Sequence, residues 1–77
     1  MSEPTCEEHA AMGLKAVRCI YSKDLDSGGV DLKDAITDTV ANLLHLAHEN
    51  DIEPDYIIHM ATMHYDAEVE EAALGAR

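Results

Sequence analysis

The sequence predicts an all-α fold of three helices, and three observations lead to this prediction. Two short breaks divide the 77 residues into three segments, each with apolar side chains at helical spacing. Each segment begins with a capping residue or a proline. The chain has no Phe or Trp and only three Tyr, whereas a β-sandwich or barrel would use more aromatic and β-branched residues. We therefore expect one helical domain over residues 1–77 with an aliphatic core.

The first helix is expected at about residues 6–23, followed by a turn with two glycines. Thr5 and Glu8 form a T-x-x-E capping box at its start. Gly13 lies on the apolar face, where glycine costs up to about 1 kcal/mol relative to alanine, so we expect another helix to cross closely there. The residues of this core face are Cys6, Ala10, Gly13, Leu14, Val17, Ile20 and Tyr21.

The second helix is expected at about residues 31–50. Asp31 is its predicted N-cap, and Asp34 adds negative charge to the first turn, where the helix dipole favours it. The core face of this helix comprises Leu32, Ile36, Thr39, Val40, Leu43, Leu46 and Ala47. The opposite side is polar and carries Asp34, Asp38, Asn42, His45 and Glu49.

The third helix is expected at about residues 54–73, with Pro54 at its first position. Its core face comprises Ile58, Ala61, Tyr65, Val69 and Ala72. A second stripe of apolar residues lies roughly opposite and comprises Tyr56, Met60, Met63 and Ala67.

The short connection between the last two helices predicts an antiparallel hairpin, against which the first helix packs. A hairpin partner covers only one side of a helix, so the second stripe of the third helix needs another cover. A chain this short also buries only about 60% of its unfolded surface. Together these features predict a homodimer, with the second stripe as its interface.

The chain is strongly acidic, with 16 Asp and Glu against 5 Lys and Arg and a formal net charge of −11. Such a chain repels a phosphate backbone, which disfavours direct binding to nucleic acid. Solubility, adaptation to high salt, or a surface for a basic partner could each explain this charge. The predicted acidic partner-binding surface consists of Asp34, Asp38, Glu49, Glu68, Glu70 and Glu71. Glu68 is also expected to pair with His64, one turn earlier.

The two cysteines are too few for a disulfide framework. Cys6 and Cys19 would be about 20 Å apart on one helix, so we expect two free and buried thiols. The sequence has no segment typical of a signal peptide or a membrane span, which predicts a cytoplasmic protein.

Five histidines make a metal site worth testing, and the best mononuclear set is His45, Glu49 and His59. Both histidines point away from the shared core on helical wheels, so we expect surface histidines and no metal or other cofactor. Asp31, Asp34 and Asp38 resemble the Mg²⁺-binding carboxylates of all-α nucleotide pyrophosphohydrolases, but no second such helix faces them. No activated nucleophile or phosphate loop is evident, which predicts a protein that is not an enzyme.

The second half of the chain, about residues 31–70, resembles an uncharacterised class of small acidic helical proteins encoded by bacteriophages and mobile elements. The resemblance rests on Asp34-x-x-Thr37-Asp38, Leu43-x-His45-Leu46-Ala47, Asp55 and Ala61-x-x-His64-Tyr65-x-Ala67-Glu68. It implies an accessory protein that acts by binding a host protein, although no activity carries over to these residues. Some such proteins mimic DNA by placing carboxylates where phosphates would be.

Two hypotheses follow for the function. The first is a non-enzymatic protein-interaction module that dimerises and binds a host protein. The alternative is an acidic DNA mimic that inhibits a host defence complex of the restriction or CRISPR type, through a partner that itself binds nucleic acid. A metal-dependent nucleotide hydrolase is the third and least favoured possibility.

Overall fold

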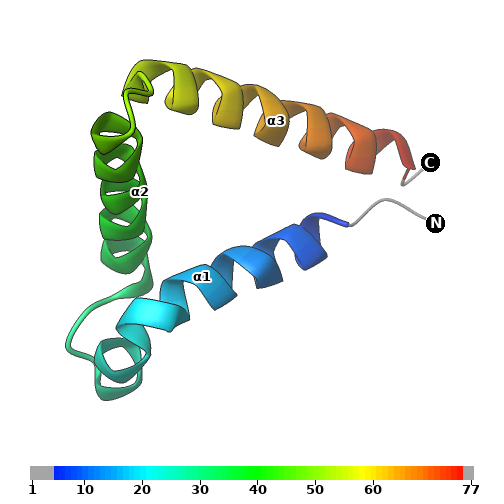
Figure 1. The fold of residues 1–77 in the computed structure, drawn as a ribbon. Coiled ribbons are helices and arrows are strands. Elements are labelled where there is room, and N and C mark those ends of the chain that lie inside the picture. Colours follow the sequence, from blue (N-terminus) through cyan, green and yellow to red (C-terminus); the bar gives the residue numbers. More distant parts are fainter. Residues whose placement is uncertain (1–4, 76–77) are drawn as a thin grey trace.

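The computed structural model describes residues 5–75, which form three helices and no strand. The helices are α1 at Cys6–Ser27, α2 at Leu32–Glu49 and α3 at Pro54–Gly75 (Figure 1). The predicted all-α class and the three helices are confirmed. Arg77, one of the few basic residues, lies outside the described residues.

The predicted caps explain where the helices begin. Thr5 Oγ1 accepts a hydrogen bond from the backbone N–H of Glu8 at 3.1 Å, as expected for an N-cap. Asp31 Oδ1 accepts from the backbone N–H of Asp34 at 2.8 Å and caps α2 in the same way. These local bonds satisfy backbone donors that the helix itself leaves free.

The first helix extends four residues beyond its predicted end. It stops where Gly28 adopts a left-handed conformation with φ 78°. The backbone N–H of Gly29 donates to the carbonyl of Asp24 at 2.8 Å, and that of Gly28 donates to the carbonyl of Leu25. This pair of bonds is a Schellman motif. The glycine therefore ends the helix, and residues 24–27, which follow the predicted end, belong to its last turn.

The second helix ends in the same motif, but with an aspartate in the left-handed position. Asp51 has φ 58°, and its backbone N–H donates to the carbonyl of His48 at 3.2 Å. The N–H of Ile52 donates to the carbonyl of Ala47 at 2.9 Å. Asn50 adds a bond from Nδ2 to the carbonyl of Leu46 at 2.9 Å, which agrees with its predicted place at the helix end.

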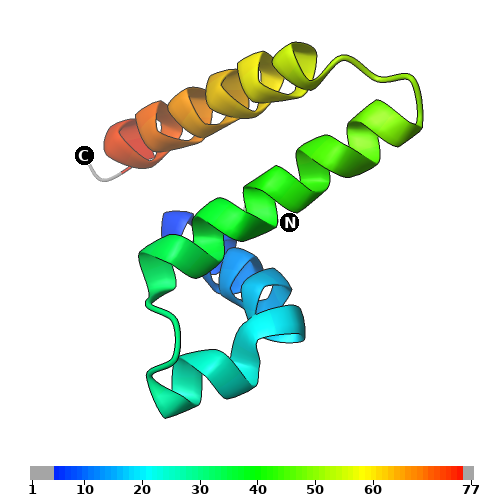
Figure 2. The ribbon, with the colours of Figure 1, turned by 90° about the vertical axis from the view of Figure 1, so that its left-hand side faces the viewer.

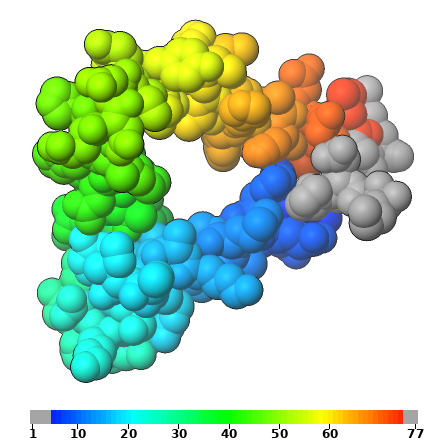
Figure 3. Space-filling view, in the orientation of Figure 1, coloured from blue at the N-terminus to red at the C-terminus, as the bar shows by residue number. Residues whose placement is uncertain are grey.

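The three helices lie along the sides of an open triangle (Figures 1 and 2). α1 passes the N-terminal half of α2, α3 leaves from the C-terminal end of α2, and the start of α1 approaches the C-terminal half of α3. The predicted antiparallel hairpin is not confirmed, because α2 and α3 diverge from their connection instead of lying side by side. A space-filling view shows an opening between the three sides (Figure 3).

This arrangement leaves very little core. Among the described residues the buried hydrophobic side chains are Val17, Ala35 and Ala47, and no large side chain is fully buried. The predicted close crossing at Gly13 is wrong, since a Cβ there would have no neighbour within 4 Å. The cysteines are free as predicted, but Cys6 and Cys19 are exposed instead of buried, because the open arrangement of the helices leaves little core.

The dimensions of the chain confirm how open it is. Its accessible surface is 6468 Å², whereas a compact protein of 8.4 kDa exposes about 4,600 Å². Its radius of gyration is 14.7 Å, against about 11.5 Å for a compact domain of this length. None of the helices in the described part of the chain is long and apolar enough to cross a membrane.

Candidate protein interface

The most unusual feature of the structure is the amount of large apolar side chain that nothing covers. Fifteen large hydrophobic residues within the described range are exposed, and all but a few belong to the helix faces that sequence periodicity assigns to a core or an interface. They are Met12, Leu14, Ile20, Leu32, Ile36, Val40, Leu43, Leu46, Ile52, Tyr56, Ile58, Met63, Tyr65, Val69 and Leu74. Where such residues form a continuous row along a helix, the exposed apolar surface is typical of an interaction site in a soluble protein.

The central part of this surface is a row of aliphatic residues on α2, which we call the α2 ridge: Leu32, Ile36, Val40 and Leu43. Their spacing of four, four and three places them on one side of the helix. All four are between 46% and 54% exposed. Ala35 and Ala47, by contrast, are buried toward the two ends of α2, where α1 passes and where α3 begins. The contacts with α1 and α3 thus cover only the flanks of the predicted core face, and its centre stays open.

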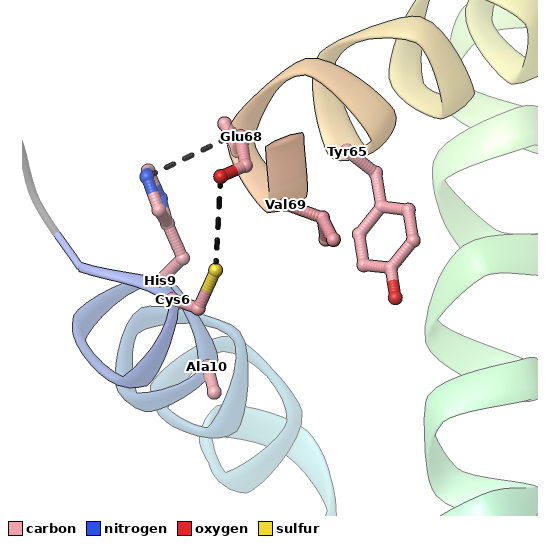
Figure 4. A pocket seen from close by; sticks show the side chains of 6 residues that line it. All are labelled: Cys6, His9, Ala10, Tyr65, Glu68 and Val69. Carbon is pink, nitrogen blue, oxygen red and sulfur yellow. Dashed lines mark hydrogen bonds and ion pairs between the residues drawn. The ribbon is translucent and has the colours of Figure 1, made fainter. Parts of the chain in front are cut away.

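The core face of α3 is uncovered in the same way. Ile58 and Val69 are nearly half exposed, and Tyr65 is 66% exposed. Tyr65 and Val69 extend from α3 into the space between α3 and α1 (Figure 4). In the predicted hairpin these side chains would have packed against α2, which lies too far away because the two helices diverge.

The second stripe of α3, predicted as the dimer interface, is also largely open. Tyr56, Met63 and Ala67 are exposed, whereas Met60 is half-buried. Both apolar sides of α3 are therefore free to bind another molecule, and the assignment of the second stripe as an interface stays a prediction.

A small cleft lies where α1 approaches α3, with a volume of about 250 Å³. It is lined by Cys6, His9, Ala10, Tyr65, Glu68 and Val69 (Figure 4). His9 Nε2 lies 3.6 Å from Glu68 Oε2, and the thiol of Cys6 donates to the backbone carbonyl of Glu68 at 3.8 Å. These two contacts join the first turn of α1 to α3. No local pattern in the sequence predicts this contact of His9, because its partner lies on another helix.

The cleft does not have the arrangement of a cysteine nucleophile. Such a site needs the thiol within hydrogen-bond reach of a base. Among the described residues no hydrogen bond joins the thiol of Cys6 to the imidazole of His9, since each group is directed at a different atom of Glu68. The two contacts instead mark the place where α1 and α3 meet.

The predicted acidic surface is divided by the structure. Asp34, Asp38 and Glu49 are exposed on α2, on the side away from the α2 ridge. Glu70 and Glu71 are exposed on α3, but Glu68 is half-buried against His9. At 3.6 residues per turn, Glu68 and Glu70 lie about 160° apart around the helix. The carboxylates of α3 therefore do not form one patch.

The predicted pair of His64 and Glu68 is not among the ion pairs of the described residues, because Glu68 faces His9 instead. The other ion pair, between Arg18 and Asp26 at 3.3 Å, is exposed and lies within α1. Neither ion pair involves a carboxylate of α2.

Within residues 5–75, no group of three or more His, Cys, Asp or Glu side chains is close enough to hold a metal ion. The set of His45, Glu49 and His59 is therefore not brought together. Asp31, near Asp34 and Asp38 in sequence, uses its carboxylate to cap α2.

The chain was also compared with known proteins. It matches no protein-family model, no curated protein and no solved structure. The candidate site therefore rests on the uncovered apolar faces of the three helices.

Proposed function

We propose that this protein is a small, non-enzymatic interaction module of the cytoplasm whose apolar helix faces are covered by another polypeptide. One observation carries the proposal: most large apolar side chains at helical spacing are exposed in the isolated chain. α1 and α2 are capped at both ends, but a single chain does not bury the apolar faces that the helices present.

The energetic argument is direct. Complete burial of a Val, Leu or Ile side chain contributes about 1.5–3 kcal/mol. The four residues of the α2 ridge are about half exposed, so each leaves roughly 1 kcal/mol unrealised. Summed over the ridge, that is comparable to a large part of the 5–15 kcal/mol that stabilises a typical domain. Association with another polypeptide would supply this missing burial.

The sequence predicts that α2 and α3 of one chain pack side by side. We propose that helices of two different polypeptides pack in this way instead. The short connections and their Schellman motifs set where each helix ends and the next begins. The apolar faces between these connections remain open to another polypeptide. Under this proposal, these faces carry apolar residues because they form the core of the complex and not of the single chain.

The exposed carboxylates of α2 extend the proposal to a second kind of partner. Asp34, Asp38 and Glu49 lie away from the α2 ridge, so they remain accessible when the ridge is covered. We propose that this row binds a basic host protein, as the resemblance to phage and mobile-element accessory proteins implies. DNA mimicry is the more specific form, in which that host protein is one that binds nucleic acid.

Light scattering and dye binding on the purified full-length chain test the proposed module. We expect either an assembly larger than one chain or a monomer that binds the hydrophobic dye ANS strongly. A monomer with a cooperative thermal transition, no dye binding and no dependence on protein concentration would contradict the proposal, because such a chain has closed on itself.

Affinity capture from a host lysate at low salt tests the acidic row. The wild-type chain should retain a basic protein that an Asp34→Asn/Asp38→Asn variant does not retain. A Glu70→Gln/Glu71→Gln variant removes the same charge from α3 and is the matched control. Equal capture by all three proteins would remove the acidic row from the proposal.

A further inference from the structure

We infer that the polypeptide covering the apolar faces is a second copy of this chain, with the α2 ridge of each copy packed against the α2 ridge of the other. The inference rests on the proposed function and names its partner. It also moves the interface from the second stripe of α3 to α2.

The first argument is the area of exposed surface. The chain exposes about 1,900 Å² more than a compact protein of its mass. If two copies each cover this excess, the interface totals roughly 3,700 Å², which lies in the range of obligate homodimers at about 2,000–5,000 Å². A contact of ordinary size buries about 800 Å² on each side, which is less than half of this excess, so a dimer centred on the α2 ridge does not need every exposed face.

The second argument is the chemistry of the α2 ridge. Leu32, Ile36, Val40 and Leu43 are aliphatic, and the chain's 16 carboxylates lie elsewhere. A basic partner finds no charge to bind on this face. A second copy offers the same uncharged aliphatic row, and the acidic residues of both copies stay on the outside, where water screens their repulsion.

The third argument is the position of the ridge. α2 is the side of the triangle that joins the other two: α1 passes its N-terminal half, and α3 leaves from its C-terminal end (Figures 1 and 2). The exposed ridge residues lie mainly between these two places. A two-fold contact there is isologous, so each ridge residue is used twice, once by each copy. Rows spaced by four residues are also the rows that interdigitate when two helices cross.

Charge-swap variants test the arrangement without requiring each variant to fold alone. The chain mass is 8.4 kDa, and light scattering of the wild type should give roughly 17 kDa, twice that value. Ile36→Glu/Leu43→Glu and Ile36→Lys/Leu43→Lys should each lose the dimer. An equimolar mixture of the two variants should regain both the dimer mass and the helical circular dichroism of the wild type, because opposite charges then meet across the ridge.

The matched control is Tyr56→Glu/Met63→Glu, which places two charges on the second stripe of α3 at comparably exposed positions. It should keep the dimer mass. Loss of the dimer in this control, with the ridge variants still dimeric, would overturn the inference and restore the second stripe as the interface.

Two further outcomes separate this inference from the proposed function. If the wild type is a dimer but the mixed ridge variants do not associate, the copies meet elsewhere, and only the further inference fails. If the wild type is a monomer that binds ANS, a different protein covers the faces, and again only the inference fails. A closed monomer that binds no ANS would overturn both.

Discussion

The α2 ridge and the second stripe of α3 are both apolar, regularly spaced and exposed, yet they differ in what surrounds them. The ridge is purely aliphatic and lies mainly between the two places where other helices approach α2. The second stripe contains a tyrosine and two methionines, and Met60 is already half-buried. Periodicity detects both rows equally well. What distinguishes them is their place in the triangle, which no local pattern records.

A single charge on each surface should give the largest difference between them. Val40→Asp should lower the free energy of unfolding by about 3 kcal/mol or more per dimer, because two carboxylates would be buried in an apolar contact. Ala67→Asp on the second stripe should cost less than about 0.5 kcal/mol, as expected for an exposed position. Urea unfolding at equal protein concentration measures both. Equal losses would remove the distinction between the two surfaces.

A substitution inside the chain, away from both exposed surfaces, tests whether the stability of one chain and the formation of the dimer are separate properties. Ala35 is completely buried, so Ala35→Leu should overpack this part of α2 and cost about 1–3 kcal/mol. The ridge itself is unchanged, so the variant should still form the dimer at high protein concentration. Thermal melts followed by circular dichroism, together with light scattering, check the two effects. A monomeric Ala35→Leu variant would show that packing around Ala35 and association through the α2 ridge depend on each other.

A change in the connection between α2 and α3 should stabilise the protein modestly without altering either surface. Asp51 has φ 58°, a conformation that glycine adopts without steric cost. Asp51→Gly should raise the free energy of unfolding by about 0.5–1 kcal/mol. The control is Gly28→Ala in the connection between α1 and α2. Gly28 has φ 78°, so replacing this glycine should destabilise the protein. A destabilised Asp51→Gly variant would mean that the side chain of Asp51 makes a contact worth more than the strain.

The smallest effect is expected where α1 meets α3. His9 and Glu68 are more than a third exposed at 3.6 Å, so solvent weakens their attraction. His9→Ala should change the unfolding free energy by less than about 0.5 kcal/mol, and molar salt should reduce the difference further. A loss above about 1 kcal/mol would contradict this expectation and show that the contact between α1 and α3 is a main support of the triangle.

Much of the local structure could be predicted from sequence because its causes are local. Thr5 and Asp31 start their helices through hydrogen bonds to residues three positions away, and Pro54 suits a first helical turn. The predicted end of α1 is about one turn too early, because Gly28, and not the polar residues before it, is the residue that ends the helix.

The candidate site could be predicted only in part. The apolar positions of the α2 ridge belong to the predicted core face, so its residues were identified but its partner was not. The contact between His9 and Glu68 joins positions far apart in sequence, and it exists only because α1 and α3 approach each other. The prediction that Gly13 is crossed closely failed for the same reason, since it depended on a neighbour that the fold does not bring there.

The sequence by itself determined the number of helices, their starting caps, the acidic character of the chain and the faces that avoid water, because each follows from residues within a few turns of one another. Tertiary structure decided which of those faces are covered. Hydrophobic attraction has no direction, so an apolar face is satisfied equally by its own chain or by another. Only the divergence of the helices at their corners leaves the α2 ridge open for a partner.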